Sequence, residues 1–199
     1  MAKIAVDVVL LPSERIMDMA IKANRALLKQ IPDKIVLDKD SCLPHISLAM
    51  GCIDRRDIAE IERILRSLAV SHPLEKLIIE GIRIGTNAKN EKVSLLQLEK
   101  TPQLQSLHEA VMKNLEPFFS HHVSENMILP PYPVSESTLI WISHYPEKSS
   151  FEKFSPHITL GYGHIENISF PPAFTASELA LCHLGNYCTC RKILASIVF

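Results

Sequence analysis

Apolar residues recur along this chain with two periods, and each period predicts a different kind of element. A nearly unbroken apolar run over residues 3–11 predicts a buried strand. Helical spacing begins after Ser13, a favourable N-cap residue, and predicts a helix that ends at about Gln30. The same spacing follows Asp54 and Thr101-Pro102, and proline is favoured at the first helical position. The pattern therefore predicts three helices, each with one apolar face.

Shorter apolar segments between and after these helices predict strands. They cover residues 43–52, 74–86, 92–99, 137–144, 155–163, 176–184 and 191–199. Trp141, the only tryptophan, lies in one of these strands and is expected in the core. Hairpins and helices are mixed along the chain, so we expect an α+β fold with two antiparallel sheets and flanking helices. The length of 199 residues suits a single domain, residues 1–199, made of two lobes.

Two connecting segments differ from the predicted elements around them. Residues 87–91 are rich in turn formers and are expected to join two strands as a hairpin. Residues 120–135 hold two adjacent histidines and three prolines, and they interrupt the apolar pattern. Long irregular segments are often binding loops or lids, so residues 120–135 are expected to form an excursion at the edge of a site.

Composition and charge limit the classes of partner. Hydrophobic residues make up 47% of the chain and charged residues 22%, which predicts a folded globular protein. A net charge of −1 argues against binding of long double-stranded nucleic acid, whereas a nucleotide or an RNA end needs only a few local donors. The sequence shows no signal peptide and no run of about 20 apolar residues. We therefore expect a cytoplasmic monomer without a membrane partner.

The cysteines are expected to be free thiols rather than metal ligands. An odd number of cysteines without a secretory signal favours a reducing compartment. The five are Cys42, Cys52, Cys182, Cys188 and Cys190. Cys182, Cys188 and Cys190 lie near His183 in the sequence and could be read as zinc ligands, but their spacing lacks the paired Cys-x2-Cys of structural zinc sites. We therefore expect no metal and no cofactor.

Two five-residue segments in opposite halves of the chain are nearly identical. Residues 44–48 read PHISL and residues 156–160 read PHITL. Successive side chains of a strand alternate between its faces, so each segment presents a histidine and a hydroxyl on one face. The pairs are His45 with Ser47 and His157 with Thr159. Such a duplication predicts two half-sites that meet across a cleft.

Two imidazoles and two hydroxyls can catalyse reactions of a phosphodiester without a metal. One neutral imidazole accepts a proton from the attacking hydroxyl or water, and one imidazolium protonates the leaving oxygen. The hydroxyls can donate hydrogen bonds to the non-bridging phosphoryl oxygens. Which histidine is the acid and which the base stays open at this point. The structural alternative is a repeat in which the histidines only end two strands.

The two segments resemble the motifs of the 2H phosphoesterase superfamily, which includes 2′-5′ RNA ligase-like proteins and cyclic nucleotide phosphodiesterases. That family is named for two His-x-Ser/Thr motifs with a hydrophobic residue between, as in His45-Ile46-Ser47 and His157-Ile158-Thr159. The resemblance implies a bilobal fold with pseudo-twofold symmetry about a central groove. It also implies metal-independent chemistry on 2′,3′-cyclic phosphates or 2′-5′ linkages, with both histidines catalytic and Ser47 and Thr159 binding phosphate.

Some features of the chain lie outside this resemblance. The separation of the two motifs is long for compact bacterial members, and residues 120–135 supply much of the excess. Arg191 is a candidate substrate contact because guanidinium suits phosphate, although a solvated residue at the start of a strand is the favoured interpretation. A non-catalytic module of the same fold that binds a nucleotide or an RNA end is the alternative function. The direction, hydrolysis or RNA ligation, stays open.

Overall fold

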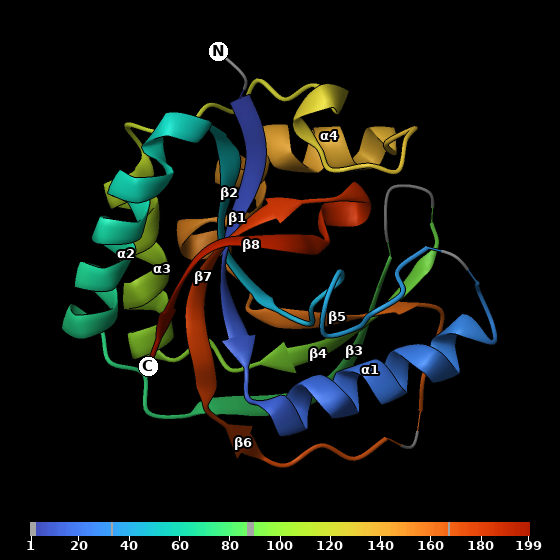
Figure 1. The fold of residues 1–199 in the computed structure, drawn as a ribbon. Coiled ribbons are helices and arrows are strands. Elements are labelled where there is room, and N and C mark those ends of the chain that lie inside the picture. The colour runs from blue at the N-terminus through green and yellow to red at the C-terminus, as the bar shows by residue number, and fades with distance from the viewer. Residues whose placement is uncertain (1–2, 33, 87–89, 167) are drawn as a thin grey trace.

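The computed structural model describes residues 3–32, 34–86, 90–166 and 168–199, and its strands form one antiparallel sheet flanked by helices (Figure 1). The strands are β1 (Lys3–Pro12), β2 (Ile46–Asp54), β3 (Leu77–Thr86), β4 (Lys92–Leu98), β5 (His157–Tyr162), β6 (Ala173–Phe174), β7 (Ala176–Leu184) and β8 (Cys190–Val198). The helices are α1 (Glu14–Leu28), α2 (Ile58–Ser71), α3 (Pro102–Leu115), α4 (Glu136–Ser143) and α5 (Tyr145–Ser149). Short 3-10 turns are η1 (Arg55–Asp57), η2 (Glu125–Met127), η3 (Phe151–Lys153) and η4 (Asn186–Cys188).

The sheet consists of two four-stranded halves that meet at one residue pair. The strand order is β6-β3-β4-β5-β2-β1-β7-β8, with eight strands in all. At its centre β2 and β5 pair antiparallel through Ile46 and Ile158 alone. The expectation of an α+β fold with antiparallel pairing is confirmed, whereas the expectation of two separate sheets is wrong because this pair joins the halves into one sheet.

Each half of the sheet is covered by helices where the hydrophobic pattern predicts them. Helix α1 packs on β5, whereas α2 and α3 pack on each other and on β8 and β2, respectively (Figure 1). The apolar faces of the three helices join the strands in one large core, to which Leu27, Leu65 and Leu107 each contribute a side chain that is at most 1% exposed. The helix α3 begins at Pro102, as predicted, and the Thr101 hydroxyl caps it by accepting a hydrogen bond from Leu104 N at 3.3 Å.

The segment 137–144 is a helix rather than the predicted strand. It forms α4, and Trp141, expected in the core, is 43% exposed. A short apolar run is compatible with either a buried strand or a helix, so its periodicity does not decide between them. Residues 120–135 are irregular as predicted, apart from η2. The β3–β4 pair confirms the predicted hairpin, while residues 87–89 of its loop lie outside the described part of the chain.

The cysteine expectation is wrong for two of the five residues. Cys182 on β7 and Cys190 on β8 form a disulfide, while Cys42, Cys52 and Cys188 are free. The argument from five free thiols to a reducing compartment therefore fails. Within the described ranges, no group of three or more His, Cys, Asp or Glu side chains is arranged to hold a metal ion. No helix in the described part of the chain is long and apolar enough to cross a membrane.

Candidate active site

The junction between the two halves of the sheet brings the two His-x-Ser/Thr segments together. Ile46 and Ile158 face each other across β2 and β5, and both side chains are fully buried. Because neighbouring residues of a strand point to opposite faces, the motif quartet lies on the other face of the sheet. The quartet consists of His45, Ser47, His157 and Thr159, and each of its members is partly exposed.

The same pair sets the two motifs side by side and in opposite directions. β2 and β5 run antiparallel at Ile46 and Ile158, and the described residues form no further pair between these strands. Each half of the molecule thus brings one histidine and one hydroxyl to the junction.

A backbone carbonyl holds each motif histidine in one tautomer. His45 Nδ1 lies 2.7 Å from the carbonyl oxygen of Leu43, and His157 Nδ1 lies 2.8 Å from that of Ser155. A carbonyl only accepts hydrogen bonds, so each Nδ1 carries a hydrogen and donates it. In the neutral rings the Nε2 atoms therefore keep their lone pairs, and each ring can take up or release a proton there.

Burial keeps both motif histidines neutral in the free protein. It lowers the pKa of His45 to about 4, against the opposing effect of the Leu43 carbonyl, and the positive charge of His157 lowers this pKa further. Burial also lowers the pKa of His157, where the Ser155 carbonyl opposes the shift and the charge of Arg83 adds to it. The influence of His157 on His45 shows that the two rings lie within electrostatic reach of each other.

A buried carboxyl group, Asp7 of β1, lies against the first motif and was missed by the sequence reasoning. Its side chain is 0% exposed, and Ser47 Oγ lies 2.6 Å from its Oδ2. The same Oδ2 lies 3.9 Å from Nε2 of His45. One acidic residue inside the apolar run 3–11 was the available signal, because a lone carboxyl in a buried strand requires a partner.

Arg83 of β3 brings a cation toward the second motif. Arg83 pairs with Leu95 of β4, and Leu95 pairs with Thr159 of β5, so the three residues form a row across the sheet. Its charge lowers the pKa of His157, third after burial and the Ser155 carbonyl. Arg83 is exposed and forms no ion pair with any carboxylate among the residues that the structure describes. No local sequence pattern marks this arginine, since only the sheet register aligns it with Thr159.

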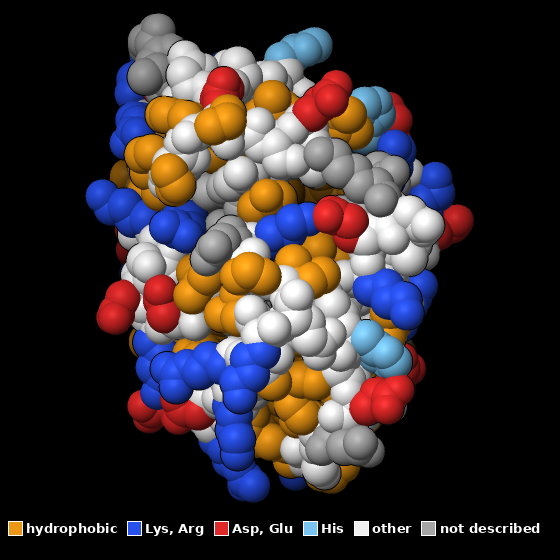
Figure 2. Space-filling view, turned by 90° about the vertical axis from the view of Figure 1, so that its right-hand side faces the viewer, with side chains coloured by type: hydrophobic (Ala, Val, Ile, Leu, Met, Phe, Trp, Pro, Cys, Tyr) orange, Lys and Arg blue, Asp and Glu red, His pale blue; other side chains and the backbone are white. Residues whose placement is uncertain are grey.

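Lysine and arginine side chains also gather more widely on the surface near these strands. Figure 2 shows the right-hand side of the molecule as drawn in Figure 1, where the ends of β3, β4 and β5 lie. Hydrophobic side chains occupy the middle of this face, and groups of Lys and Arg side chains lie on both sides of them. Asp and Glu side chains lie among these groups, so the face carries charges of both signs.

Arg191, the remaining candidate contact, interacts with a thiol. It lies on β8, half-buried, and its charge and hydrogen bond act to lower the pKa of Cys42. Burial has the larger effect and raises the pKa of Cys42 to about 11. Among the described residues no hydrogen bond or ion pair connects Arg191 with the motif quartet. A role for Arg191 in substrate binding stays a prediction.

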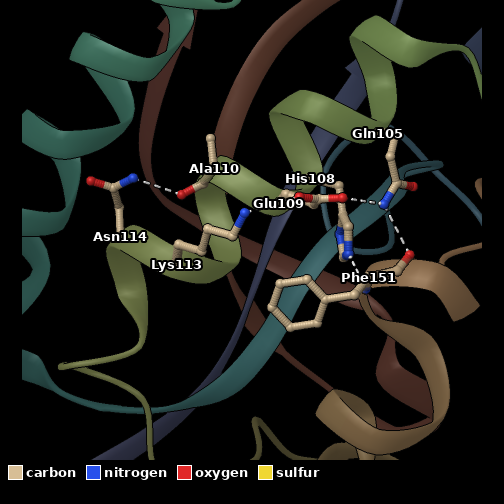
Figure 3. Close-up of polar contacts among 7 residues, drawn as sticks. All are labelled: Gln105, His108, Glu109, Ala110, Lys113, Asn114 and Phe151. Carbon is tan, nitrogen blue, oxygen red and sulfur yellow. Dashed lines mark hydrogen bonds and ion pairs between the residues drawn. The ribbon is translucent and has the colours of Figure 1, made fainter.

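His108 of α3 links the strand of the first motif to the segment that leads into the second. Its Nδ1 donates to the carbonyl oxygen of Leu48 at 2.7 Å. Its Nε2 accepts from Phe151 N at 2.7 Å (Figure 3). Its ring stacks on that of Phe154, with 4.0 Å between centroids. Gln105, one turn earlier, donates to Phe151 O at 3.0 Å. These contacts fix the approach to β5, and the sequence showed only a histidine beside an apolar helix stripe.

Comparisons with solved structures establish the fold. E. coli LigT in its apo form aligns with 100% of this chain and 98% of its own, at a TM-score of 0.52 and 15% identity. E. coli LigT in complex with phosphate gives a TM-score of 0.55 and 12% identity, covering 100% and 99% of the two chains. A phosphoesterase structure gives 0.50 and 10%, with the same coverage. No protein-family model and no curated protein sequence matches the chain. The chain therefore has the fold of LigT, as the resemblance of its two motifs predicted.

Proposed function

We propose that this protein is a phosphodiesterase that acts on 2′,3′-cyclic phosphates or 2′-5′ linkages of nucleotides and RNA ends. The observation that carries the proposal is the motif quartet, two imidazoles and two hydroxyls on one face of the sheet at the junction of its halves. The fold shared with LigT supports a phosphoesterase at the coarse level. The nature of the substrate rests on the resemblance of the motifs.

The two histidines take different roles in this proposal. Burial lowers the pKa of His45 to about 4 and also lowers that of His157, and the charge of His157 contributes to the shift of His45, so the pair shares at most one proton, which we assign to His157. His45 is then the general base and His157 the general acid. An anionic phosphate bound between the rings favours the protonated form of His157, because an opposite charge stabilises an imidazolium.

Hydrolysis of a 2′,3′-cyclic phosphate follows from these roles. His45 Nε2 takes a proton from water as the water oxygen forms a bond to phosphorus. The bond between phosphorus and one ribose oxygen breaks, and His157 Nε2 gives that oxygen its proton. The product is a phosphomonoester with a free ribose hydroxyl, and both rings return to their starting state by exchange with solvent. Ligation is the same displacement with a ribose hydroxyl of a second RNA end in place of water: His45 takes the proton of that hydroxyl, and His157 protonates the ribose oxygen that leaves phosphorus.

The charge on the phosphoryl oxygens is met by donors from both halves. Ser47 and Thr159 donate hydrogen bonds to the non-bridging oxygens, and the guanidinium of Arg83 lies on the side of Thr159. We propose that no metal takes part, that the halves are related by an approximate twofold axis through the groove, and that the protein works as a cytoplasmic monomer. The alternative, a module that binds a nucleotide without turnover, does not require two matched imidazoles.

The test is hydrolysis of nucleoside 2′,3′-cyclic phosphates in the presence of EDTA. Each general acid or base contributes about 10²–10⁴-fold, so His45→Ala and His157→Ala should each lower kcat by at least about 100-fold. Circular dichroism of each variant checks that the fold is intact. A panel with 2′-5′-linked dinucleotides and RNA ends, with the phosphate position identified in each product, decides the substrate class and the direction.

Three results would contradict the proposal. Activity that is lost in EDTA would show that a metal is required, and activity retained in both alanine variants would show that the histidines are not catalytic. Calorimetric binding of a nucleotide that is never turned over would support the non-catalytic alternative instead.

A further inference from the structure

Ser47 has a single hydroxyl hydrogen, and two acceptors compete for it. The Ser47 Oγ lies 2.6 Å from Oδ2 of the buried Asp7, and the proposed function requires the same hydroxyl to donate to a phosphoryl oxygen of the substrate. A hydroxyl donates one hydrogen bond and accepts up to two. If Asp7 is a carboxylate, Ser47 must donate to it and has no hydrogen left for the phosphate. If Asp7 is a carboxylic acid, it can donate to Ser47 Oγ and leave the hydroxyl hydrogen free.

The surroundings of Asp7 favour the neutral acid. The side chain is 0% exposed, and its Oδ1 has no hydrogen-bond partner within the described ranges. No lysine or arginine of the described chain forms an ion pair with it, and His45 Nε2, at 3.9 Å, is beyond hydrogen-bond distance. A buried carboxylate that has a hydroxyl and the backbone N–H of Ala49 beside it, but no cation, is strongly disfavoured relative to the neutral acid.

The titratable groups that face Asp7 from neighbouring elements are themselves neutral. Tyr145 of α5 and Cys188 of η4 lie within electrostatic reach, and burial raises the pKa of each well above its usual range. On β7, the register partner of Asp7 is Cys182, which is in the disulfide. His45, before β2, is neutral because burial lowers its pKa to about 4. No element packed against Asp7 thus supplies a positive charge that would stabilise a carboxylate.

We propose that Asp7 is a protonated carboxylic acid that positions Ser47 by donating a hydrogen bond to its Oγ, so that the Ser47 hydroxyl donates to the phosphate. This inference rests on the proposed function, because it assigns a donor role to Ser47. Asp7 itself touches no substrate and is a positioning residue. It contributes a chain of two hydrogen bonds, from the carboxylic acid to the hydroxyl and from the hydroxyl to the phosphoryl oxygen.

The proposal predicts an alkaline limit to activity. Burial raises the pKa of Asp7 well above its usual value, while the Ser47 hydroxyl and, more weakly, the backbone N–H of Ala49 act in the opposite direction. Below this raised pKa the acid donates to Ser47. Above it, the carboxylate takes the hydroxyl hydrogen back, and the affinity for phosphate falls.

The protonation state is tested first, without any turnover. The carboxyl carbon of Asp7 is followed by ¹³C NMR in the ligand-free protein across the pH range, with Asp7→Asn used to assign the signal. The chemical shift of a carboxylic acid is expected at pH 7. A carboxylate shift at pH 7 would overturn the proposal, whatever the enzymatic activity. Loss of activity on the cyclic phosphates with a protonated Asp7 would instead count against the proposed function alone.

Two substitutions then test the positioning role. Asp7→Asn keeps a permanent donor, Nδ2, for Ser47 Oγ, whereas Asp7→Val of similar size has none. We expect Asp7→Val to lower kcat/KM by about tenfold, the worth of one hydrogen bond, and Asp7→Asn to restore it to within about threefold of the wild type. The alkaline fall of activity should disappear in Asp7→Asn, since an amide does not ionise there. An Asn variant as impaired as the Val variant would overturn the proposal.

The Ser47→Ala background separates positioning from general destabilisation. Without the hydroxyl, Asp7→Val should cause no further loss of kcat/KM, because the two residues act on the phosphate through one hydrogen bond. A further tenfold loss in that background would show that Asp7 acts by another route. Binding of inorganic phosphate, followed by NMR titration, supplies the same comparison for variants that turn over too slowly to assay.

Discussion

At the scale of single residues, proline explains why the two motifs hold their histidines alike. Leu43-Pro44-His45 and Ser155-Pro156-His157 each place a proline between the histidine and the carbonyl that holds its Nδ1. Proline fixes its own φ and restricts the preceding residue to extended conformations. The proline therefore restricts the orientation of the carbonyl group that accepts the hydrogen bond from Nδ1. The proline before each histidine thus has a structural role in addition to the His-x-Ser/Thr motif.

His108 makes the stability of the protein depend on pH. Burial lowers its pKa, opposed by the Leu48 carbonyl, and its Nε2 must be unprotonated to accept from Phe151 N. The unfolded state therefore binds more protons below the unperturbed pKa of about 6.5, and the free energy of unfolding falls as pH falls through that value. The neutral ring stabilises the fold fully only above about pH 6.5.

His108→Gln tests this dependence. Glutamine can donate to Leu48 O and accept from Phe151 N without titrating, so the free energy of unfolding should fall less between pH 7 and pH 5 than in the wild type. Urea denaturation at each pH measures it, and His122→Gln at an exposed position is the matched control. Other histidines whose pKa is lowered by burial also contribute to the pH dependence of the wild type, so the slope in His108→Gln should be reduced but not zero. These histidines are His45, His121, His157 and His183. A slope as steep in His108→Gln as in the wild type would contradict the prediction.

Single residues also show which parts of the candidate site could be predicted from the sequence. The histidines and hydroxyls of the motif quartet were identifiable because the same five-residue pattern occurs twice. Asp7 and Arg83 were not, because their relevance depends on which strands are neighbours. Asp7 reaches Ser47 only because β1 lies beside β2, and Arg83 reaches the row of Thr159 only through β4.

At the scale of elements, one buried asparagine joins α1 to the strand of the second motif. Asn24 Nδ2 donates to the carbonyl oxygens of Ile35 at 2.9 Å and Leu160 at 2.8 Å, and its Oδ1 accepts from Leu37 N at 2.9 Å. Gly161 leaves room for this amide, since a Cβ at that position would lie 2.7 Å from Asn24 Nδ2. The position of β5 relative to α1 thus depends on three hydrogen bonds from one side chain.

Asn24→Leu should strongly destabilise the fold. It removes all three hydrogen bonds and leaves three backbone groups unpaired in the interior, each at a cost of about 1–3 kcal/mol. A loss of at least about 3 kcal/mol in the free energy of unfolding is expected from urea denaturation. Lys22→Leu, at an exposed position of the same helix, should stay within about 0.5 kcal/mol of the wild type. A comparable change in the free energy of unfolding of both variants would show that Asn24 contributes no more to stability than an exposed residue of α1.

The periodic elements were predictable and the short ones were not. The helices α1, α2 and α3 have a complete apolar stripe and cap residues near their starts, and they form where the pattern predicts them. The segment of α4 has eight residues, too few for a helical period to stand out against a buried strand. The strand β6 has two residues and owes its existence to pairing with β3. Whether such short segments form a helix or a strand depends on their tertiary contacts.

At the scale of the whole molecule, the proposed ligand lies between two halves that share one strand pair. A ligand that contacts both halves binds only the assembled protein and stabilises it by mass action, by about 2.7 kcal/mol at 100 times its Kd. For a protein of this size each kcal/mol raises Tm by about 2–4 °C. A nucleoside phosphomonoester, the product of the proposed reaction, should therefore raise the Tm by about 5–10 °C at that concentration.

Variants of either motif should remove most of this thermal shift. Differential scanning fluorimetry of His45→Ala and His157→Ala compares the two halves directly, because each variant removes one imidazole from one half. Loss of the shift in both variants agrees with a ligand held between the halves. If one variant keeps the full shift, the ligand contacts only the other half and the proposed geometry of binding is wrong.

The global arrangement could be predicted only in outline. Two copies of one motif in opposite halves predicted that the halves meet at a site, and the junction at Ile46 and Ile158 brings the motifs together. The merging of both halves into a single sheet could not be predicted, because it depends on one pair of residues. Nor could the Cys182–Cys190 disulfide, because an odd number of cysteines does not indicate which two become neighbours.

The carbonyl that holds each imidazole belongs to the same half of the molecule as the imidazole itself. Leu43 moves with His45, and Ser155 moves with His157. A change in the angle between the halves therefore alters the separation of the two Nε2 atoms and leaves the tautomer of each ring unchanged. Neither imidazole ring has to flip about its χ2 angle between successive reactions. The distance between the two proton-carrying nitrogens is thus the one property of the rings that depends on how the halves pack against each other.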